Sequence, residues 1–158
     1  MTSRLTIAVC APRPLFTACD DSDARTLIEL SRAAGHDAES ITLPSPDVDG
    51  TFSERGALRW ALVDLFARGQ RASDVVVCMH PDTLLLRHPN KIAWVRQPWS
   101  LSVAETLRFA SRVVVTHGGS LRTSHDDDAG DGAFVRVGAI ADVLDVVCAG
   151  AIPVGAMR

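Results

Sequence analysis

The chain has 158 residues, which suits one domain with a continuous core better than two. Hydrophobic residues make up 47% of it and aromatic residues only 5%, so we expect an aliphatic interior. The net charge of −3, with acidic and basic residues mixed along the chain, argues against a protein that binds nucleic acid through a broad cationic field.

Apolar runs alternate with segments of helical periodicity along most of the chain. Short aliphatic or β-branched runs predict strands, and amphipathic segments predict helices. The predicted strands cover 5–11 (ended by Pro12 and Pro14), 40–43, 74–79, 91–95, 112–116, 134–137 and 152–154. The predicted helices cover 24–34, 53–68, 103–110 and 141–149, and 120–132 is predicted to be an acidic, glycine-bearing loop.

This alternation predicts the fold class. Continuous apolar strands between amphipathic helices are typical of a parallel sheet covered on both faces. We therefore expect an α/β protein, with residues 1–158 forming a single three-layer Rossmann-like domain and a mostly parallel sheet. No apolar run approaches the roughly 18 residues of a membrane helix, and no signal pattern precedes the first strand, so we expect no membrane span and a cytoplasmic location.

Ligands of such sheets bind outside the carboxyl ends of the strands. The residues expected at this edge are Arg13, His80, Arg96, His117 to Ser120, and Gly138. His80, at the end of the most strongly β-branched run, is either a functional group or a hydrogen-bonded part of the scaffold.

The segment 81–99 gathers polar and cationic side chains between two predicted strands. The candidate ligand-binding residues in it are Arg87, His88, Lys91, Arg96 and Gln97. Arginine favours bidentate contacts with phosphate or carboxylate, so one hypothesis is a shared anion pocket. The alternative is that Pro89 and Asn90 form a turn flanked by solvated charges.

A second candidate follows the strand predicted at 112–116. Gly118 and Gly119 let the backbone approach a ligand, Ser120 offers a hydroxyl, and His117 offers an imidazole that titrates near neutral pH. The alternative is a flexible turn with an exposed histidine. The acidic stretch 125–128 misses the spacing of a calcium loop, and we predict neither a metal site nor a cofactor.

The order of residues in 80–97 resembles the N-terminal, acceptor-side domain of GT-B glycosyltransferases of the family-four type. The matching residues are Pro81, Arg87, His88, Pro89, Asn90, Lys91, Trp94 and Gln97. The resemblance implies transfer of a sugar from a nucleotide sugar to a small acceptor. It implies that arginine and lysine side chains support the departing diphosphate, and that His80 or His117 orients the acceptor.

The alternative function is a non-catalytic Rossmann module that binds a small anion or a partner subunit. Enzymes of the family carry a second Rossmann domain, for which 158 residues leave no room. A second copy of the chain, or a complementary donor-binding subunit, would then complete the cleft between domains.

Overall fold

Six parallel strands form the central sheet, in the order β2-β1-β3-β4-β6-β8, and a parallel pair, β5-β7, lies apart from it. The computed structural model describes residues 4–16, 21–46, 49–63, 65, 73–116, 119–122 and 134–150. The strands are β1 (Thr6–Pro14), β2 (Asp37–Ser45), β3 (Val75–Cys78), β4 (Lys91–Val95), β5 (Pro98–Ser102), β6 (Arg112–Val115), β7 (Ser120–Arg122) and β8 (Phe134–Arg136). The helices are α1 (Ser22–Ala33), α2 (Glu54–Ala61), the 3₁₀-helix η1 (Pro81–Leu85), α3 (Val103–Leu107) and α4 (Ile140–Gly150).

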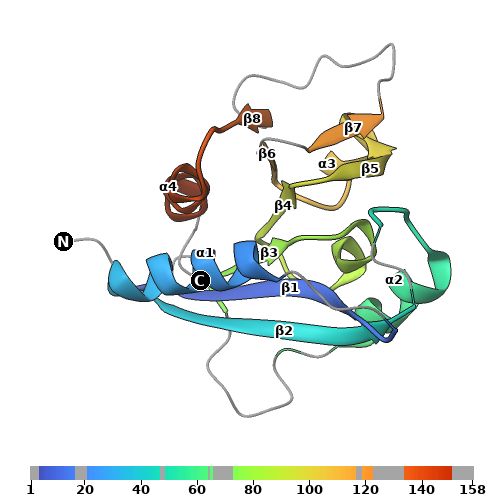
Figure 1. The fold of residues 1–158 in the computed structure, drawn as a ribbon, viewed down its shortest axis with the longest axis horizontal. Helices are drawn as coiled ribbons and strands as arrows, with labels where there is room; N and C mark the ends of the chain where they lie inside the picture. The colour runs from blue at the N-terminus through green and yellow to red at the C-terminus, as the bar shows by residue number, and fades with distance from the viewer. Residues whose placement is uncertain are drawn as a thin grey trace.

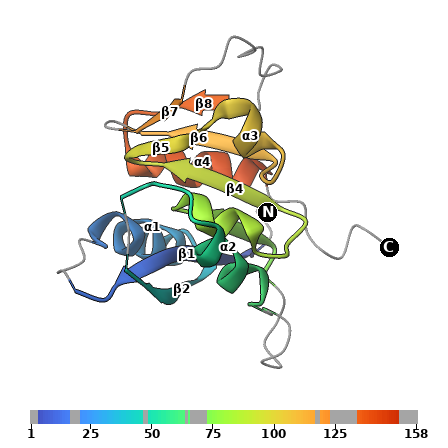
Figure 2. The same cartoon turned by 90° about the vertical axis from the view of Figure 1, so that its right-hand side faces the viewer.

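Helices cover both faces of this sheet, which confirms the predicted α/β class and parallel sheet. One hydrophobic cluster joins the sheet to α1 and α4, with Leu27 and Val147 fully buried in it. The cluster on the opposite face contains Trp60 of α2 and Leu84 of η1. In Figure 1 β1 runs from left to right, and in Figure 2 β4 is seen lengthwise with its carboxyl end to the left.

The order of the strands reverses at β1. The chain moves from β1 outward to the edge strand β2, then crosses back to place β3 on the other side of β1. The carboxyl ends of β1 and β3 are therefore the topological switch point, the place where ligands of doubly wound sheets bind.

Pro12 and Pro14 do not end β1, contrary to the sequence prediction, and β1 pairs with β2 as far as Pro14. The carbonyl of Cys10 faces β3, because it accepts a hydrogen bond from the N–H of Met79. Successive residues of a strand point their backbone N–H and C=O groups to opposite sides, so the backbones of both prolines also face the β3 side. On that side the pairing with β3 ends at Cys10. Neither proline therefore removes a hydrogen bond from the sheet.

Other elements differ from the prediction in length or kind. Strand β2 is longer than predicted. It is an edge strand in which more and less exposed residues alternate, so it lacks the long apolar run from which a full-length strand would be predicted. Helix α2 ends earlier than predicted, and β5, β7 and η1 were not predicted. The strand predicted at 152–154 lies outside the described residues. None of the helices in the described part of the chain has the length and apolar character needed to cross a membrane.

Lys91 begins β4 as a buried cation, only 9% exposed. Its ammonium group donates hydrogen bonds to the main-chain carbonyls of Leu84 and Leu86, at the end of η1. Burial lowers the pKa of Lys91, while the nearby Cys78 raises it. Lys91 thus ties η1 to the amino-terminal end of β4.

The turn before β4 is held in a similar way by His88 and Asn90. Both ring nitrogens of His88 lie 2.9 Å from a main-chain carbonyl, Nδ1 from that of Asn90 and Nε2 from that of Ser73. The side-chain amide of Asn90 donates to the carbonyl of Asp74 at 3.0 Å. These bonds fasten the turn to the segment that enters β3.

Replacing Lys91 by Met is expected to destabilise the fold by about 2–3 kcal/mol, because two carbonyls of η1 lose their donor. Arg87→Met is the matched control, since Arg87 is exposed and should change the free energy of unfolding by less than about 0.5 kcal/mol. Urea unfolding of both variants measures the difference. Equal stabilities would show that the Lys91 contacts contribute nothing.

Candidate functional site

His80 lies at the switch point, two residues after the last residue of β3. It is 1% exposed, and its Nδ1 accepts a hydrogen bond from the backbone N–H of Asp82 at 3.2 Å. Because Nδ1 uses its lone pair as an acceptor, the proton of the neutral ring is on Nε2. Nε2 is buried and has no hydrogen-bond partner.

The charge state of His80 follows from its surroundings. The pKa of His80 is lowered to about 4, mainly by burial, while the charge of Asp49 raises it and that of Arg96 lowers it. The ring is therefore neutral near pH 7, and its free N–H is a hydrogen-bond donor. It is not a general base, since the one lone pair on the ring already accepts from Asp82.

Asp82 connects η1 to the start of α2. Its carboxylate accepts the N–H of Ser53 at 2.7 Å, and the Asp82 side chain is 4% exposed. Helix α2 approaches this carboxylate so closely that a Cβ on Gly56 would lie 1.9 Å from Oδ2. Only glycine at this position lets the helix begin against Asp82.

The segment 49–53 passes between η1 and β5 and is bonded to both. Gly50 accepts the N–H of Ser100 at 3.1 Å, and the N–H of Phe52 donates to Oγ of Ser100 at 2.9 Å. The backbone of Gly50 has a φ of +85°, and a Cβ there would lie 2.2 Å from the carbonyl oxygen of Pro98. Asp49 accepts a hydrogen bond from the backbone N–H of Thr51, and this bond lowers the pKa of the Asp49 carboxyl group.

Two arginines flank His80 at the same edge. If the pairing of β1 and β4 with β3 is extended past the ends of these strands, Arg13 and Arg96 both align with position 81, one residue beyond His80. Arg96 Nη1 lies 3.5 Å from a carboxylate oxygen of Asp23 in α1, and Arg13 is exposed. By the alternation of the strands Arg13 and Arg96 belong to the α1 face of the sheet, whereas His80 continues the series of Val76 and Cys78 on the α2 face.

The structure does not bring all the predicted ligand-binding residues together. Arg87, His88 and Lys91 lie before or at the start of β4, whereas Arg96 and Gln97 follow its end. The length of β4, about 16 Å at the rise of a strand, separates the two groups. The shared anion pocket of Arg87, Lys91 and Arg96 is therefore not formed, and His88 and Lys91 hold main-chain carbonyls instead.

The predicted glycine turn is described only in part, because His117 and Gly118 lie outside the described residues. Gly119 packs on the end of β4, where a Cβ would lie 2.0 Å from the carbonyl oxygen of Val95. Its N–H donates to the carbonyl of Thr116 at 2.9 Å. Ser120 is exposed and pairs with Pro98 in the β5-β7 pair. Gly119 is thus needed for backbone packing.

The sequence analysis missed Asp49, Asp82 and Trp99. Trp99 is 4% exposed, and its indole Nε1 has no hydrogen-bond partner. The only signal for Asp82 was its place two residues after His80. Asp49 and Trp99 are brought to the site by contacts between distant segments, for which the chain offers no local pattern.

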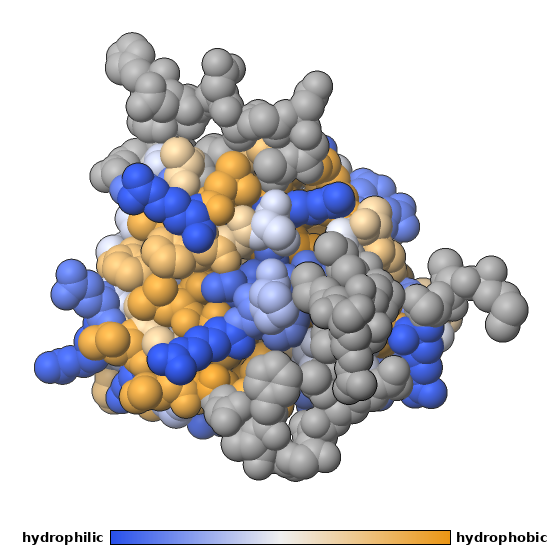
Figure 3. Space-filling view, turned by 180° about the vertical axis from the view of Figure 1, so that it is seen from behind, coloured by the Kyte–Doolittle hydropathy of each residue, from blue (hydrophilic) through white to orange (hydrophobic). Residues whose placement is uncertain are grey.

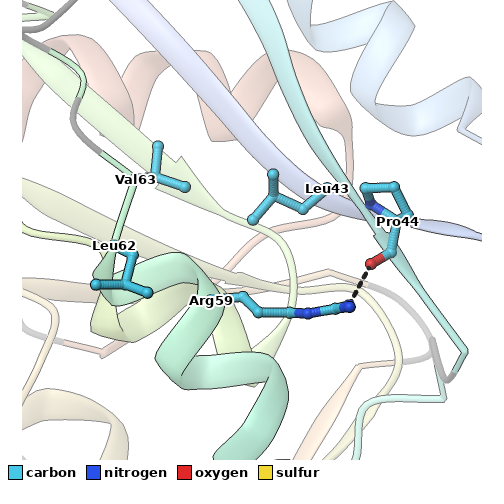
Figure 4. Close-up of a pocket in the computed structure, with 5 residues that line it drawn as sticks. All are labelled: Leu43, Pro44, Arg59, Leu62 and Val63. Carbon is cyan, nitrogen blue, oxygen red and sulfur yellow. Dashed lines mark hydrogen bonds between the residues drawn. The ribbon is translucent and has the colours of Figure 1, made fainter.

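A separate apolar groove of about 280 Å³ lies between β2 and α2, lined by Leu43, Pro44, Arg59, Leu62 and Val63. Figure 3, the view from behind, shows apolar surface broken by hydrophilic side chains. Arg59 spans the groove and donates to the carbonyl of Pro44 at 3.0 Å (Figure 4). The residues that line the groove include no nucleophile, general acid or general base, so the groove is not a candidate catalytic site.

The described thiols and metal-binding side chains do not add a reactive centre. Cys10 and Cys78 are buried, and burial raises the pKa of both, that of Cys78 to about 11. Within the described ranges, no group of three or more His, Cys, Asp or Glu side chains is arranged to hold a metal ion.

Comparisons with protein-family models, with curated proteins and with solved structures found no match to this chain. The resemblance to GT-B glycosyltransferases therefore stays a prediction.

His80 should make stability depend on acid pH. Its pKa is about 4 in the folded chain, against 6.5 for an ordinary histidine, so between these values only the unfolded chain takes up the proton. Stability is then complete above pH 6.5 and falls by about 3 kcal/mol as the pH drops to 4. Asn at position 80 keeps an acceptor near Nδ1 and cannot titrate.

The variant His80→Asn is therefore expected to lose less stability than the parent chain between pH 6.5 and 4. Denaturant unfolding across this range provides the measurement, and the difference between the two profiles isolates the histidine from other titrating groups. Parallel profiles would mean that His80 is not held neutral by the fold.

Proposed function

We propose that this chain is a Rossmann-like binding module that holds a small anion at the carboxyl edge of its sheet. The observation that carries the proposal is the placement of Arg13 and Arg96 on either side of the end of β3, at the switch point. Strands lie about 4.8 Å apart, so the backbones of β1 and β4 are about 10 Å apart with β3 between them. Both side chains can reach one anion lying above β3.

The alternation of the strands supports the same conclusion. Ile7, Val9 and Ala11 of β1 pack on the α1 face, and Arg13 continues this series. In β4, Ile92 and Trp94 face the same side, and Arg96 continues their series. The two cations thus belong to one face of the sheet, next to the amino-terminal end of the twelve-residue α1, which favours negative charge.

The proposal concerns binding rather than catalysis. Near neutral pH His80 has no lone pair available as a base, and Asp82 uses its carboxylate to hold Ser53. The prediction of sugar transfer relied on Arg87 and Lys91 to bind the diphosphate, and neither residue lies at this edge. Nucleotide sugars remain one class of anion to test.

The test is calorimetric and thermal-shift binding of inorganic phosphate, citrate, and the UDP, GDP and ADP sugars. We expect one class to stabilise the chain, and we expect Arg13→Ala and Arg96→Ala each to weaken its binding about tenfold or more. Asp23→Asn should strengthen binding, because it removes a carboxylate that competes with the anion for Arg96. Arg87→Ala is the matched control and should change nothing.

Two results would contradict the proposal. One is the absence of stabilisation by every anion at millimolar concentration. The other is binding that survives Arg13→Ala and Arg96→Ala but is lost in Arg87→Ala, which would restore the cationic segment before β4 as the site.

A further inference from the structure

Thr116 lies at the carboxyl edge of the sheet, one strand away from Arg96. Strands β4 and β6 are neighbours, and extending their pairing by one residue sets Thr116 directly beside Arg96 (Figure 2). The N–H of Thr116 still donates to the carbonyl of Val95 at 3.1 Å, so the ladder reaches this level. Neighbouring strands are about 4.8 Å apart, and the two residues are therefore adjacent.

Two contacts show that both side chains project from the α1 face. Nε1 of Trp94 donates to Oγ1 of Thr116 at 3.2 Å, and Trp94 belongs to the hydrophobic cluster beneath α1. Nη1 of Arg96 lies 3.5 Å from a carboxylate oxygen of Asp23, in the first turn of α1. Alternation along β1 adds Arg13 to this face. The two arginines and Thr116 thus form one row, which crosses β1, β4 and β6.

The hydroxyl group of Thr116 is held with its hydrogen unused. A threonine oxygen has two lone pairs and one hydrogen, and the N–H of the fully buried Trp94 takes one lone pair. The hydrogen therefore points away from the indole ring. Among the residues that the structure describes, no acceptor takes it. Thr116 is half-buried, so its hydroxyl group can offer one donor and one acceptor to a ligand.

The charges in this row decide what suits Thr116. The anion of the proposed site lies above β3, between Arg13 and Arg96, and Thr116 is two strands away from β3. A second anionic group beside Thr116 would compete with Asp23 for Arg96, so a neutral group is favoured there. A hydroxyl group that donates and accepts is matched by a ligand hydroxyl group, which also does both.

We propose that the ligand of this site carries a neutral hydroxyl group a few bonds from its anionic group, and that this hydroxyl group exchanges hydrogen bonds with Oγ1 of Thr116. This inference rests on the proposed function and makes it narrower. The ligand class is a small phosphorylated or carboxylated alcohol or polyol. Thr116 is then a specificity-determining residue, and a bare oxyanion fills only the cationic part of the row.

The experiment compares anions that differ by their hydroxyl groups: glycerol 3-phosphate with propyl phosphate, gluconate with hexanoate, and 4-hydroxybutyrate with butyrate. Calorimetry on the full chain measures the affinity of both members of each pair. In at least one pair, we expect the hydroxyl-bearing member to bind about fivefold tighter or more, because only this member pairs with Thr116.

Three variants test the role of the Thr116 hydroxyl group. Thr116→Val removes it and keeps the branched shape, so the ratio of the two affinities in a pair should fall to about one. Thr116→Ser keeps the hydroxyl group and should keep most of the preference. Thr42→Val is the matched control, because Thr42 is an exposed threonine of the edge strand β2, and its ratio should equal that of the parent chain.

The affinity ratio also separates ligand binding from a role in the scaffold. Thr116→Val leaves the buried N–H of Trp94 without its acceptor, so its thermal midpoint without ligand should be lower than that of Thr116→Ser. If Thr116 only supported Trp94, Thr116→Val would weaken both members of a pair by the same factor. If Thr116→Val does not fold, its combination with Trp94→Phe removes both partners of the hydrogen bond and replaces it in the test.

Failure of this inference can be distinguished from failure of the proposed function. If anions bind through Arg13 and Arg96 but no pair is discriminated, or if Thr116→Val discriminates as the parent chain does, the hydroxyl inference is wrong and the anion site stands. If no anion binds and the arginine variants have no effect, both are wrong.

Discussion

The buried Asp82 holds three parts of the molecule together at the carboxyl edge. Its N–H donates to Nδ1 of His80, and its carboxylate accepts the N–H of Ser53 at the start of α2. Helix α2 can pack this closely against Asp82 only with glycine at position 56, because the Cβ of any other residue would collide with this carboxylate. The geometry of His80, its tautomer and the direction in which its free N–H points all follow from this arrangement.

The opposite edge of the sheet is held by side chains that pair with main-chain carbonyls. Lys91 binds two carbonyls of η1, and His88 and Asn90 bind carbonyls of the turn and of the segment before β3. In the sequence these residues look like an anion-binding group because they are polar and cationic. In the fold they replace the regular hydrogen bonds that an irregular turn cannot form. Their chemistry is therefore used for structure.

Polar residues have different roles at the two edges of the sheet. At the amino-terminal end of β4, the donors of Lys91 and Asn90 have partners within the chain. At the carboxyl edge, the ring N–H groups of His80 and Trp99 do not, and two arginines stand on either side of β3.

The parallel α/β architecture could be predicted from the residues alone, since aliphatic runs such as Val75–Cys78 and amphipathic helices such as α1 carry their own periodicity. The sequence also placed His80, Arg13 and Arg96 at the carboxyl edge, because residues that follow parallel strands must lie there. The contacts that give Lys91 and His88 a structural role and place Asp82 against His80 are evident only in the folded chain. Those relations depend on contacts between segments far apart in the chain, and a hydrogen bond to a main-chain carbonyl leaves no trace in residue type or spacing.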